Sequence, residues 1–260
     1  MRSFLLPRSR LPGGVTATVL LFLIQTTLAW SAERPLYFLT PAAVDPIALL
    51  PAPPITGSPE QLADMTTVVN ARNTCTSNDL AVALEQNHGL TVFNLAPFLG
   101  SDFTSKRLPK TAALCRHAQS DTARFVTIAK QHFKRLRPSV VDTNLLVTTP
   151  ALDFSYPSGH SAEATVIASI LMELVPDQAD RIFIAGRNAG WHRVQLARHY
   201  PSDIQAGRVL AQTVFRAMKS DPSYLAEFAQ AKGEIAAVLG RPLIPLLTPS
   251  GGKAAESAVH

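Results

Sequence analysis

Residues 154–175 read FSYPSGHSAEATVIASILMELV, a polar turn followed directly by a long apolar run. From Ser161 to Val175 the apolar residues occupy nearly every side of a helix, which is typical of a helix buried all round. Pro157 and Gly159 suit neither a helix interior nor a strand, so the turn should end where this helix begins. The stretch therefore predicts a buried helix that is opened by a glycine-containing turn.

The rest of the chain adds helices through the same 3.6-residue periodicity. Ser58 can cap a helix that starts at Pro59, and a second clear pattern covers 122–136. We expect further helices over 77–88, 108–118, 178–197, 202–218 and 221–238. The sequence shows no convincing alternating strand pattern and no repeat. The predicted fold class is all-α, a compact single-domain helical bundle.

The two ends of the chain differ in composition from its middle. Residues 1–29 combine three arginines with an apolar run over 15–28, which predicts a cleaved signal peptide. A membrane anchor is the alternative, but the run is short and contains polar residues. Residues 30–56 are rich in proline and should form an extended arm on the domain. Residues 57–240 should form the all-α domain, and 241–260 a flexible tail.

Charge and cysteine usage narrow the possible functions. The net charge falls from +5 to +2 without the first 29 residues, which gives little reason to expect a nucleic acid partner. No later apolar run reaches the length of a membrane span, so we expect no membrane association after signal cleavage. An exported chain meets an oxidising compartment, where Cys75 and Cys115 could form one disulfide or stay as two buried thiols.

The segment KQHFKRLRP, which begins at Lys130, carries a cluster of basic side chains. A continuous helix would place Lys130 and Arg137, seven residues apart, on nearly the same face. Pro138 should end that helix at Arg137, so that a bound anion could reach both cations. Taken alone, the cluster is more simply interpreted as a solvated basic face that also includes Lys134 and Arg135.

The segment HRVQLARHYPSD, which begins at His192, combines the chemistry of a base with that of a cation. Arg193 and His199 can converge only if a helix ends between them, and Pro201 supplies the stop. Asp203, at the start of the next helix, can then accept one ring N–H of His199 and leave the other nitrogen free as a base or nucleophile. A purely structural histidine–aspartate contact is the alternative.

The turn before the apolar helix contains Ser158, Gly159 and His160. Backbone N–H groups at a helix start are unpaired and bind anions, and glycine lets an oxyanion approach closely. His160 at the mouth could give a proton to a leaving group. The alternative is an ordinary helix start in which Ser158 is only the capping residue.

Together the three segments suit a tetrahedral dianion. They supply three cations, a helix-start anion site and two histidines, one of which has a carboxylate partner. One histidine can attack phosphorus while the other protonates the departing oxygen. No metal or other cofactor is required, because fixed cations can supply the electrostatic stabilisation.

In this order, K-x6-R-P, P-S-G-H and R-x5-H-x3-D resemble the three-part signature of the type 2 phosphatidic acid phosphatase superfamily. The stretch FSYPSGHS, the exported form and the proline-rich arm are most similar to the bacterial class A non-specific acid phosphatases, over about 35–240. The resemblance implies hydrolysis of small phosphomonoesters through a phosphohistidine in the periplasm or outside the cell. It implies His199 as nucleophile, Asp203 as its orienting partner and His160 as general acid. The implied phosphate-binding residues are Lys130, Arg137, Ser158, Gly159 and Arg193.

The sequence departs from the family pattern at one position and allows several alternatives. The family usually has serine before the arginine of the third motif, whereas this chain has His192, which leaves the hydrogen bonding near Arg193 open. Vanadium haloperoxidases share a very similar constellation, although the short exported chain favours a phosphatase. A membrane lipid phosphatase, a non-catalytic phosphate-binding protein and a metal site of His192, His199 and Asp203 are further alternatives. The physiological substrate and a possible homo-oligomer stay undetermined.

Overall fold

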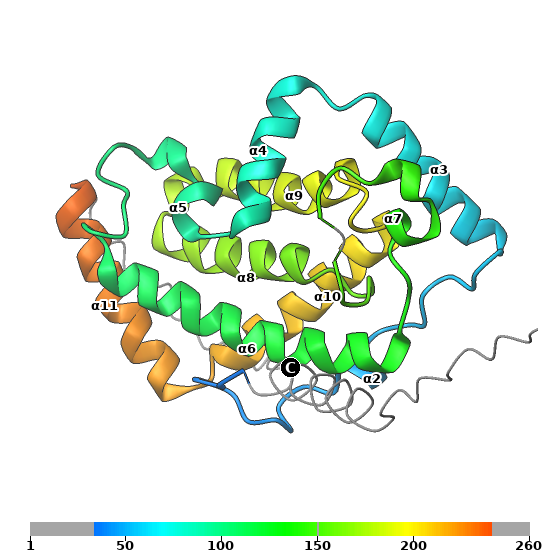
Figure 1. Cartoon of the computed structure of the whole chain (residues 1–260). Coiled ribbons are helices and arrows are strands. Elements are labelled where there is room, and N and C mark those ends of the chain that lie inside the picture. The colour runs from blue at the N-terminus through cyan, green and yellow to red at the C-terminus, as the bar shows by residue number, and fades with distance from the viewer. Residues whose placement is uncertain (1–33, 150, 241–260) are drawn as a thin grey trace, which may run out of the picture.

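The computed structural model describes residues 34–149 and 151–240, and their secondary structure is helical throughout (Figure 1). The all-α prediction is confirmed. The α-helices are α2 (Pro46–Leu49), α3 (Pro59–Asn73), α4 (Ser77–His88), α5 (Val92–Leu95), α6 (Pro109–Phe133), α7 (Pro138–Val141), α8 (Gly159–Leu174), α9 (Ala179–Gln195), α10 (Pro201–Met218) and α11 (Pro222–Leu239). Single 3₁₀ turns are η1 (Pro97–Leu99), η2 (Thr143–Leu145) and η3 (Pro176–Gln178).

Helix α8 is the centre of the molecule, as its all-round apolar sequence predicts. It packs against α6, α9 and α10, and α11 packs against α6 (Figure 1). Ile167, Ile170 and Leu171 of α8 are fully buried, and each such side chain contributes about 1.5–3 kcal/mol through burial. The turn before α8 is therefore attached to a helix that is buried among three others.

Helix α6 corrects two expectations. The helices expected over 108–118 and 122–136 are one continuous helix, because neither proline nor glycine interrupts it. The helix also ends at Phe133, where Lys134 adopts a left-handed conformation with φ of 51°, and not at Arg137. Arg137 is extended, with φ of −77° and ψ of 154°, so it does not share a helix face with Lys130.

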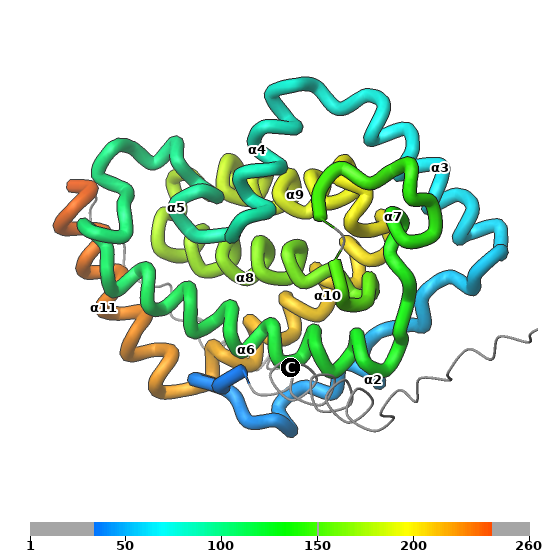
Figure 2. The backbone as a smooth tube through the Cα atoms, viewed as in Figure 1, coloured from blue at the N-terminus to red at the C-terminus, as the bar shows by residue number. Residues whose placement is uncertain are grey.

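The proline-rich arm is anchored on α6 by one buried carboxylate. Asp121, in the middle of α6, accepts three consecutive backbone N–H groups of the arm at 2.7–3.0 Å, from Tyr37, Phe38 and Leu39. The arm then passes beneath α6 before the chain enters α3 (Figure 2). It is not extended throughout, because Asp45 caps one turn of helix, α2.

Several expectations concern other parts of the chain. The signal peptide, the start of the arm and the tail from 241 lie outside the described residues. Within the described ranges, none of the helices combines the length and apolarity that crossing a bilayer needs. Cys75 and Cys115 are both free thiols, and burial raises the pKa of Cys115 to about 12.

Candidate active site

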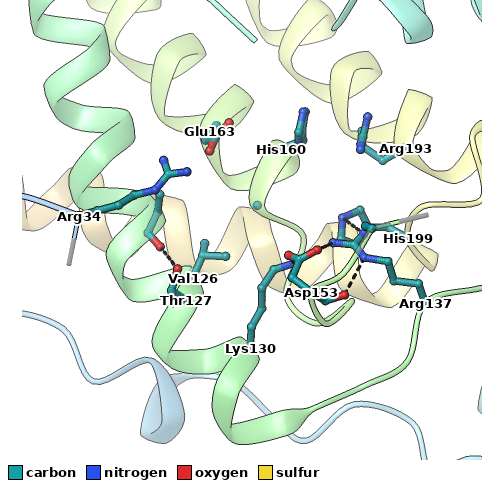
Figure 3. A pocket seen from close by; sticks show the side chains of 13 residues that line it. Arg34, Val126, Thr127, Lys130, Arg137, Asp153, His160, Glu163, Arg193 and His199 are labelled. Carbon is teal, nitrogen blue, oxygen red and sulfur yellow. Dashed lines mark hydrogen bonds and ion pairs between the residues drawn. The ribbon is translucent and has the colours of Figure 1, made fainter. Parts of the chain in front are cut away.

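A cavity of about 260 Å³ lies where α6, α8 and α9 meet the connections that follow α6 and α9. Six of the eight residues that the sequence singles out line it: Lys130, Arg137, Gly159, His160, Arg193 and His199 (Figure 3). Ser158 and Asp203 are fully buried and are not among its lining residues. The three sequence segments thus come together around one space.

The corner between α9 and α10 places His199. Helix α9 ends at Gln195 and α10 begins at Pro201, as the sequence predicts from the spacing of Arg193 and His199. The backbone N–H groups of Arg198 and His199 donate to the Arg193 carbonyl at 2.9 and 3.2 Å, which closes the corner. The turn therefore brings both side chains to the same cavity.

His199 has a carboxylate behind its ring and a cation in front of it. Its Nδ1 is 3.4 Å from Oδ2 of Asp203, and its Nε2 is 3.0 Å from Nη1 of Arg137. Because the guanidinium can only donate, Nε2 carries a lone pair and Nδ1 carries the proton. Burial, with the charges of Arg137 and Lys130, holds the pKa of His199 well below its ordinary value. The ring is thus neutral and lines the cavity, with its Nε2 lone pair accepting from Arg137.

Asp203 is held by a buried cation that the sequence interpretation missed. Arg135 donates through Nη1 to Oδ1 of Asp203 at 2.7 Å and through Nη2 to Asp64 on α3 at 2.8 Å. Its guanidinium also stacks 3.9 Å from the centre of the Tyr200 ring. The interpretation of Arg135 as part of a solvated basic face is therefore wrong. No local pattern distinguishes it from the exposed Lys134.

Lys130 and Arg137 meet a second missed residue, Asp153. Oδ2 of Asp153 lies 2.6 Å from Nζ of Lys130, and Oδ1 lies 2.7 Å from Nη2 of Arg137 (Figure 3). Burial and the charge of Arg137 lower the pKa of Lys130 to about 8, although Asp153 opposes this shift. The cations repel one another, and Asp153 offsets part of that repulsion.

The turn before α8 has the N-cap that the alternative interpretation proposed, and one of the amides expected to be free is occupied. The Ser158 hydroxyl accepts from the Ser161 N–H at 3.3 Å, which confirms the N-cap. The Ser158 N–H donates to the Asp203 carbonyl at 3.0 Å, so the expectation that this amide points outward is wrong. Gly159 lines the cavity. Gly207 of α10 allows the close approach, since a Cβ there would lie 2.5 Å from the Ser158 carbonyl oxygen.

His160 and Arg193 complete the cavity wall. Burial lowers the pKa of His160 to about 3, together with the charges of neighbouring cations, of which Arg193 has the largest effect. Arg193 donates through Nη1 to Asn87 of α4 at 2.9 Å. His192, the departure from the family pattern, is buried and pairs through Nδ1 with Gln86 at 2.8 Å. It therefore helps to dock α4 beside Arg193 and is not among the residues that line the cavity.

The metal alternative is not supported by the arrangement of side chains. Among residues 34–149 and 151–240, no group of three or more His, Cys, Asp or Glu side chains is placed to hold a metal ion. His192, His199 and Asp203 thus do not form the metal site that the sequence allowed.

Comparisons with known proteins agree with the motifs. Residues 113–226 match the family model described as the PAP2 superfamily. An acid phosphatase of Zymomonas mobilis is 31% identical over 200 residues, which cover 74% of this chain and 75% of that protein. A non-specific acid phosphatase of Providencia stuartii is 30% identical over 211 residues, which cover 77% of this chain and 85% of that protein. The chain belongs to the PAP2 superfamily. Within it, this enzyme is a member of the class A non-specific acid phosphatases.

The fold of this PAP2 protein is also similar to that of a bacterial vanadium-dependent iodoperoxidase. The two structures superpose with a TM-score of 0.51 at 17% identity, over 68% of this chain and 53% of the other. The chain thus spans about half the length of that protein, and the likeness concerns the fold alone.

Proposed function

We propose that this protein is an acid phosphatase that hydrolyses phosphomonoesters through a covalent phosphohistidine on His199, without a metal. The observation that carries the proposal is the position of Nε2 of His199. This atom belongs to a neutral ring that lines the same cavity as Lys130, Arg137 and Arg193, and in the empty site it accepts from Arg137.

The phosphate dianion of the substrate would bind among the three cations. Burial and the charge of Arg137 lower the pKa of Lys130 to about 8. Burial and the charges of Arg198 and Arg137 lower the pKa of Arg193 to about 9, so a dianion placed among these cations is strongly favoured. The Gly159 N–H at the start of α8 would contact one oxygen. The Ser158 amide already donates to the Asp203 carbonyl and its side chain is fully buried, so we propose a phosphate contact from the Gly159 amide alone.

Attack by His199 would then form the P–N bond as the P–O bond to the leaving group breaks. Asp203 accepts the Nδ1–H and stabilises the positive charge that develops on the ring, while the Arg135 ion pair keeps this carboxylate in place. The cations, now paired with the phosphoryl oxygens, stabilise the charge of the transition state.

His160 would protonate the leaving oxygen. Its pKa is low in the empty site because of burial and the charges of Arg193, Lys130 and Arg137. A bound dianion counteracts these charges, so the ring takes up a proton together with the substrate. After the alcohol leaves, the neutral ring can accept a proton from water as that water attacks phosphorus. The P–N electron pair returns to Nε2, and inorganic phosphate is released.

The leaving group would extend into a second cavity of about 430 Å³ beside the first. His160, Glu163 and Arg34 line both cavities, and Arg116 lines the second. His160 therefore stands between the bound phosphate and the space that the alcohol would occupy. We further propose that the protein reaches the periplasm or the cell exterior through residues 1–29.

A trapping experiment tests the mechanism. The enzyme is quenched with ³²P-labelled substrate, and we expect an acid-labile, base-stable phosphoryl group on His199. His199→Ala and His160→Ala should each lower kcat/KM by about 10³-fold or more with an unchanged circular dichroism spectrum. His132→Ala is the matched control, because His132 is exposed on α6. Full activity of His199→Ala would refute the mechanism, and phosphate binding without turnover by the wild-type protein would favour a non-catalytic role.

A further inference from the structure

The carboxylate of Asp153 occupies the cavity beside the two cations that come from α6 and the connection after it. Each of its oxygens contacts one cation, Lys130 at 2.6 Å and Arg137 at 2.7 Å (Figure 3). Lysine and arginine bind phosphoryl oxygens through the same charge-assisted hydrogen bonds. The carboxylate therefore uses donors that a substrate phosphate needs.

We propose that Asp153 is an internal competitor for the phosphate site. In the empty enzyme its carboxylate takes the place of two phosphoryl oxygens, and it leaves when a phosphate dianion binds. This proposal rests on the proposed function only in taking Lys130 and Arg137 as phosphate ligands.

Protonation does not remove this carboxylate under assay conditions. Burial alone would raise the pKa of Asp153, but Lys130 and Arg137 outweigh it and hold the pKa well below its usual range. The group thus stays negative at any pH at which an acid phosphatase is assayed. A dianion beside it would be repelled at contact distance, so the carboxylate has to move away.

The surroundings of Asp153 allow that movement. Its side chain is 54% exposed, whereas the side chains of Lys130 and Arg137 are 9% and 5% exposed. The neighbouring Leu152 is fully exposed, so little packing holds this part of the connection. Rotation of the Asp153 side chain can thus carry the carboxylate into solvent without disturbing the core.

The main chain of the same segment would keep both cations in position after the carboxylate leaves. The Phe154 carbonyl oxygen accepts from Nζ of Lys130, and the Asp153 carbonyl oxygen accepts from Nε of Arg137 at 3.1 Å. Nη1 of Arg137 is held separately by the Arg198 carbonyl at 2.8 Å. The side chain of Asp153 is therefore dispensable for orientation and acts mainly as a competing anion.

An internal competitor raises the apparent Kd for phosphate, because phosphate binds only to the fraction of molecules in which the carboxylate has left the site. Two ion pairs to a half-exposed carboxylate are worth little individually, so we expect Asp153→Asn to lower the Kd for inorganic phosphate by about three- to thirtyfold. The KM for a phosphomonoester should fall in the same direction. kcat should not rise, because tighter product binding slows phosphate release.

Isothermal titration with inorganic phosphate and with orthovanadate at pH 6 measures this effect on the full chain. Asp142→Asn is the matched control. It removes one negative charge from the same connection, where Asp142 bonds the Asn144 N–H at 3.0 Å, and should leave the Kd unchanged. Asp153→Ala provides a second variant that cannot hydrogen-bond to the cations. An unchanged or higher Kd in both Asp153 variants would overturn the proposal.

A crystal structure with phosphate gives an independent test. We expect the Asp153 carboxylate to have left Lys130 and Arg137, and a structure in which it contacts both cations beside a bound phosphate would overturn the proposal. The binding of phosphate does not require turnover, so its Kd tests the role of Asp153 independently of the phosphohistidine mechanism. Tighter binding by Asp153→Asn without any phosphohistidine in the wild-type enzyme would refute the proposed function alone.

Discussion

Arg135→Met tests how the site is held together, because the Arg135 guanidinium joins two helices through buried carboxylates. Nη2 is 2.8 Å from Asp64 on α3, and Nη1 is 2.7 Å from Asp203 on α10. Methionine keeps the apolar stem of the side chain and removes its charge. Both carboxylates would then lose their cationic partner, and Tyr200 would lose the cation stacked on its ring.

Removing one partner of a buried ion pair typically lowers the free energy of unfolding by about 3–5 kcal/mol. The lower value applies here, because Asp203 still accepts the Tyr200 N–H at 2.8 Å and Asp64 still accepts from the Ser202 hydroxyl. A loss of about 3 kcal/mol lowers Tm by roughly 6–12 °C in a domain of this size. kcat should fall as well, since fewer donors hold the carboxylate behind His199.

Urea denaturation followed by circular dichroism measures the free energy of unfolding, and a chromogenic phosphomonoester measures kcat. Arg216→Met is the matched control, because Arg216 is exposed on α10 and bonds a carbonyl of its own helix; it should change stability by less than about 0.5 kcal/mol. Adding Asp64→Asn to Arg135→Met should restore part of the lost stability by removing an uncompensated charge. The reasoning is refuted if Arg135→Met stays within about 1 kcal/mol of wild type, or if Asp64→Asn destabilises it further.

Two further predictions concern protonation and packing. The pKa values of His160 and His199 lie below the ordinary 6.5, so unfolding takes up protons below pH 6.5. The free energy of unfolding should therefore fall between pH 6.5 and 4, by up to about 1.4 kcal/mol per pH unit for each ring. Denaturation at a series of pH values measures this dependence, and His160→Gln should make it shallower. Gly207→Ala should destabilise by about 1–3 kcal/mol and lower kcat/KM, because its Cβ would press on the Ser158 carbonyl. Thermal melts measure both effects, and Gly233→Ala, with no neighbour within 4 Å, should be neutral or stabilising. Equal effects of the two substitutions would contradict this packing argument.

The fold could be predicted to the extent that each helix is encoded locally. Caps and periodicity placed α3, α4 and α8 to α11, because the signals lie within the helices themselves. The two expected helices over 108–118 and 122–136 are one helix, α6, since neither proline nor glycine interrupts it. The anchoring role of Asp121 in the interior of α6 could not be predicted, because its carboxylate binds the backbone of the arm more than 80 residues away. No local pattern contains that partner.

The site shows the same division between local and distant information. The convergence of Arg193, His199 and Asp203 follows from one helix end and one proline, so spacing alone predicted it. Arg135 and Asp153 were missed because their function depends on partners 16 to 71 residues away. The role of His192 was open for the same reason, since its partner Gln86 lies 106 residues earlier.

The carboxylates of Asp203 and Asp153 differ in a way that burial explains. Asp203 is 0% exposed, and its cation, Arg135, is not one of the proposed phosphate ligands, so the pair can stay intact through the reaction. Asp153 is 54% exposed, and its cations are the ones that a phosphate requires. The carboxylate that stays in place, Asp203, is therefore buried and paired with a cation that does not bind phosphate. The carboxylate that leaves, Asp153, faces solvent and pairs with the cations that bind the substrate phosphate.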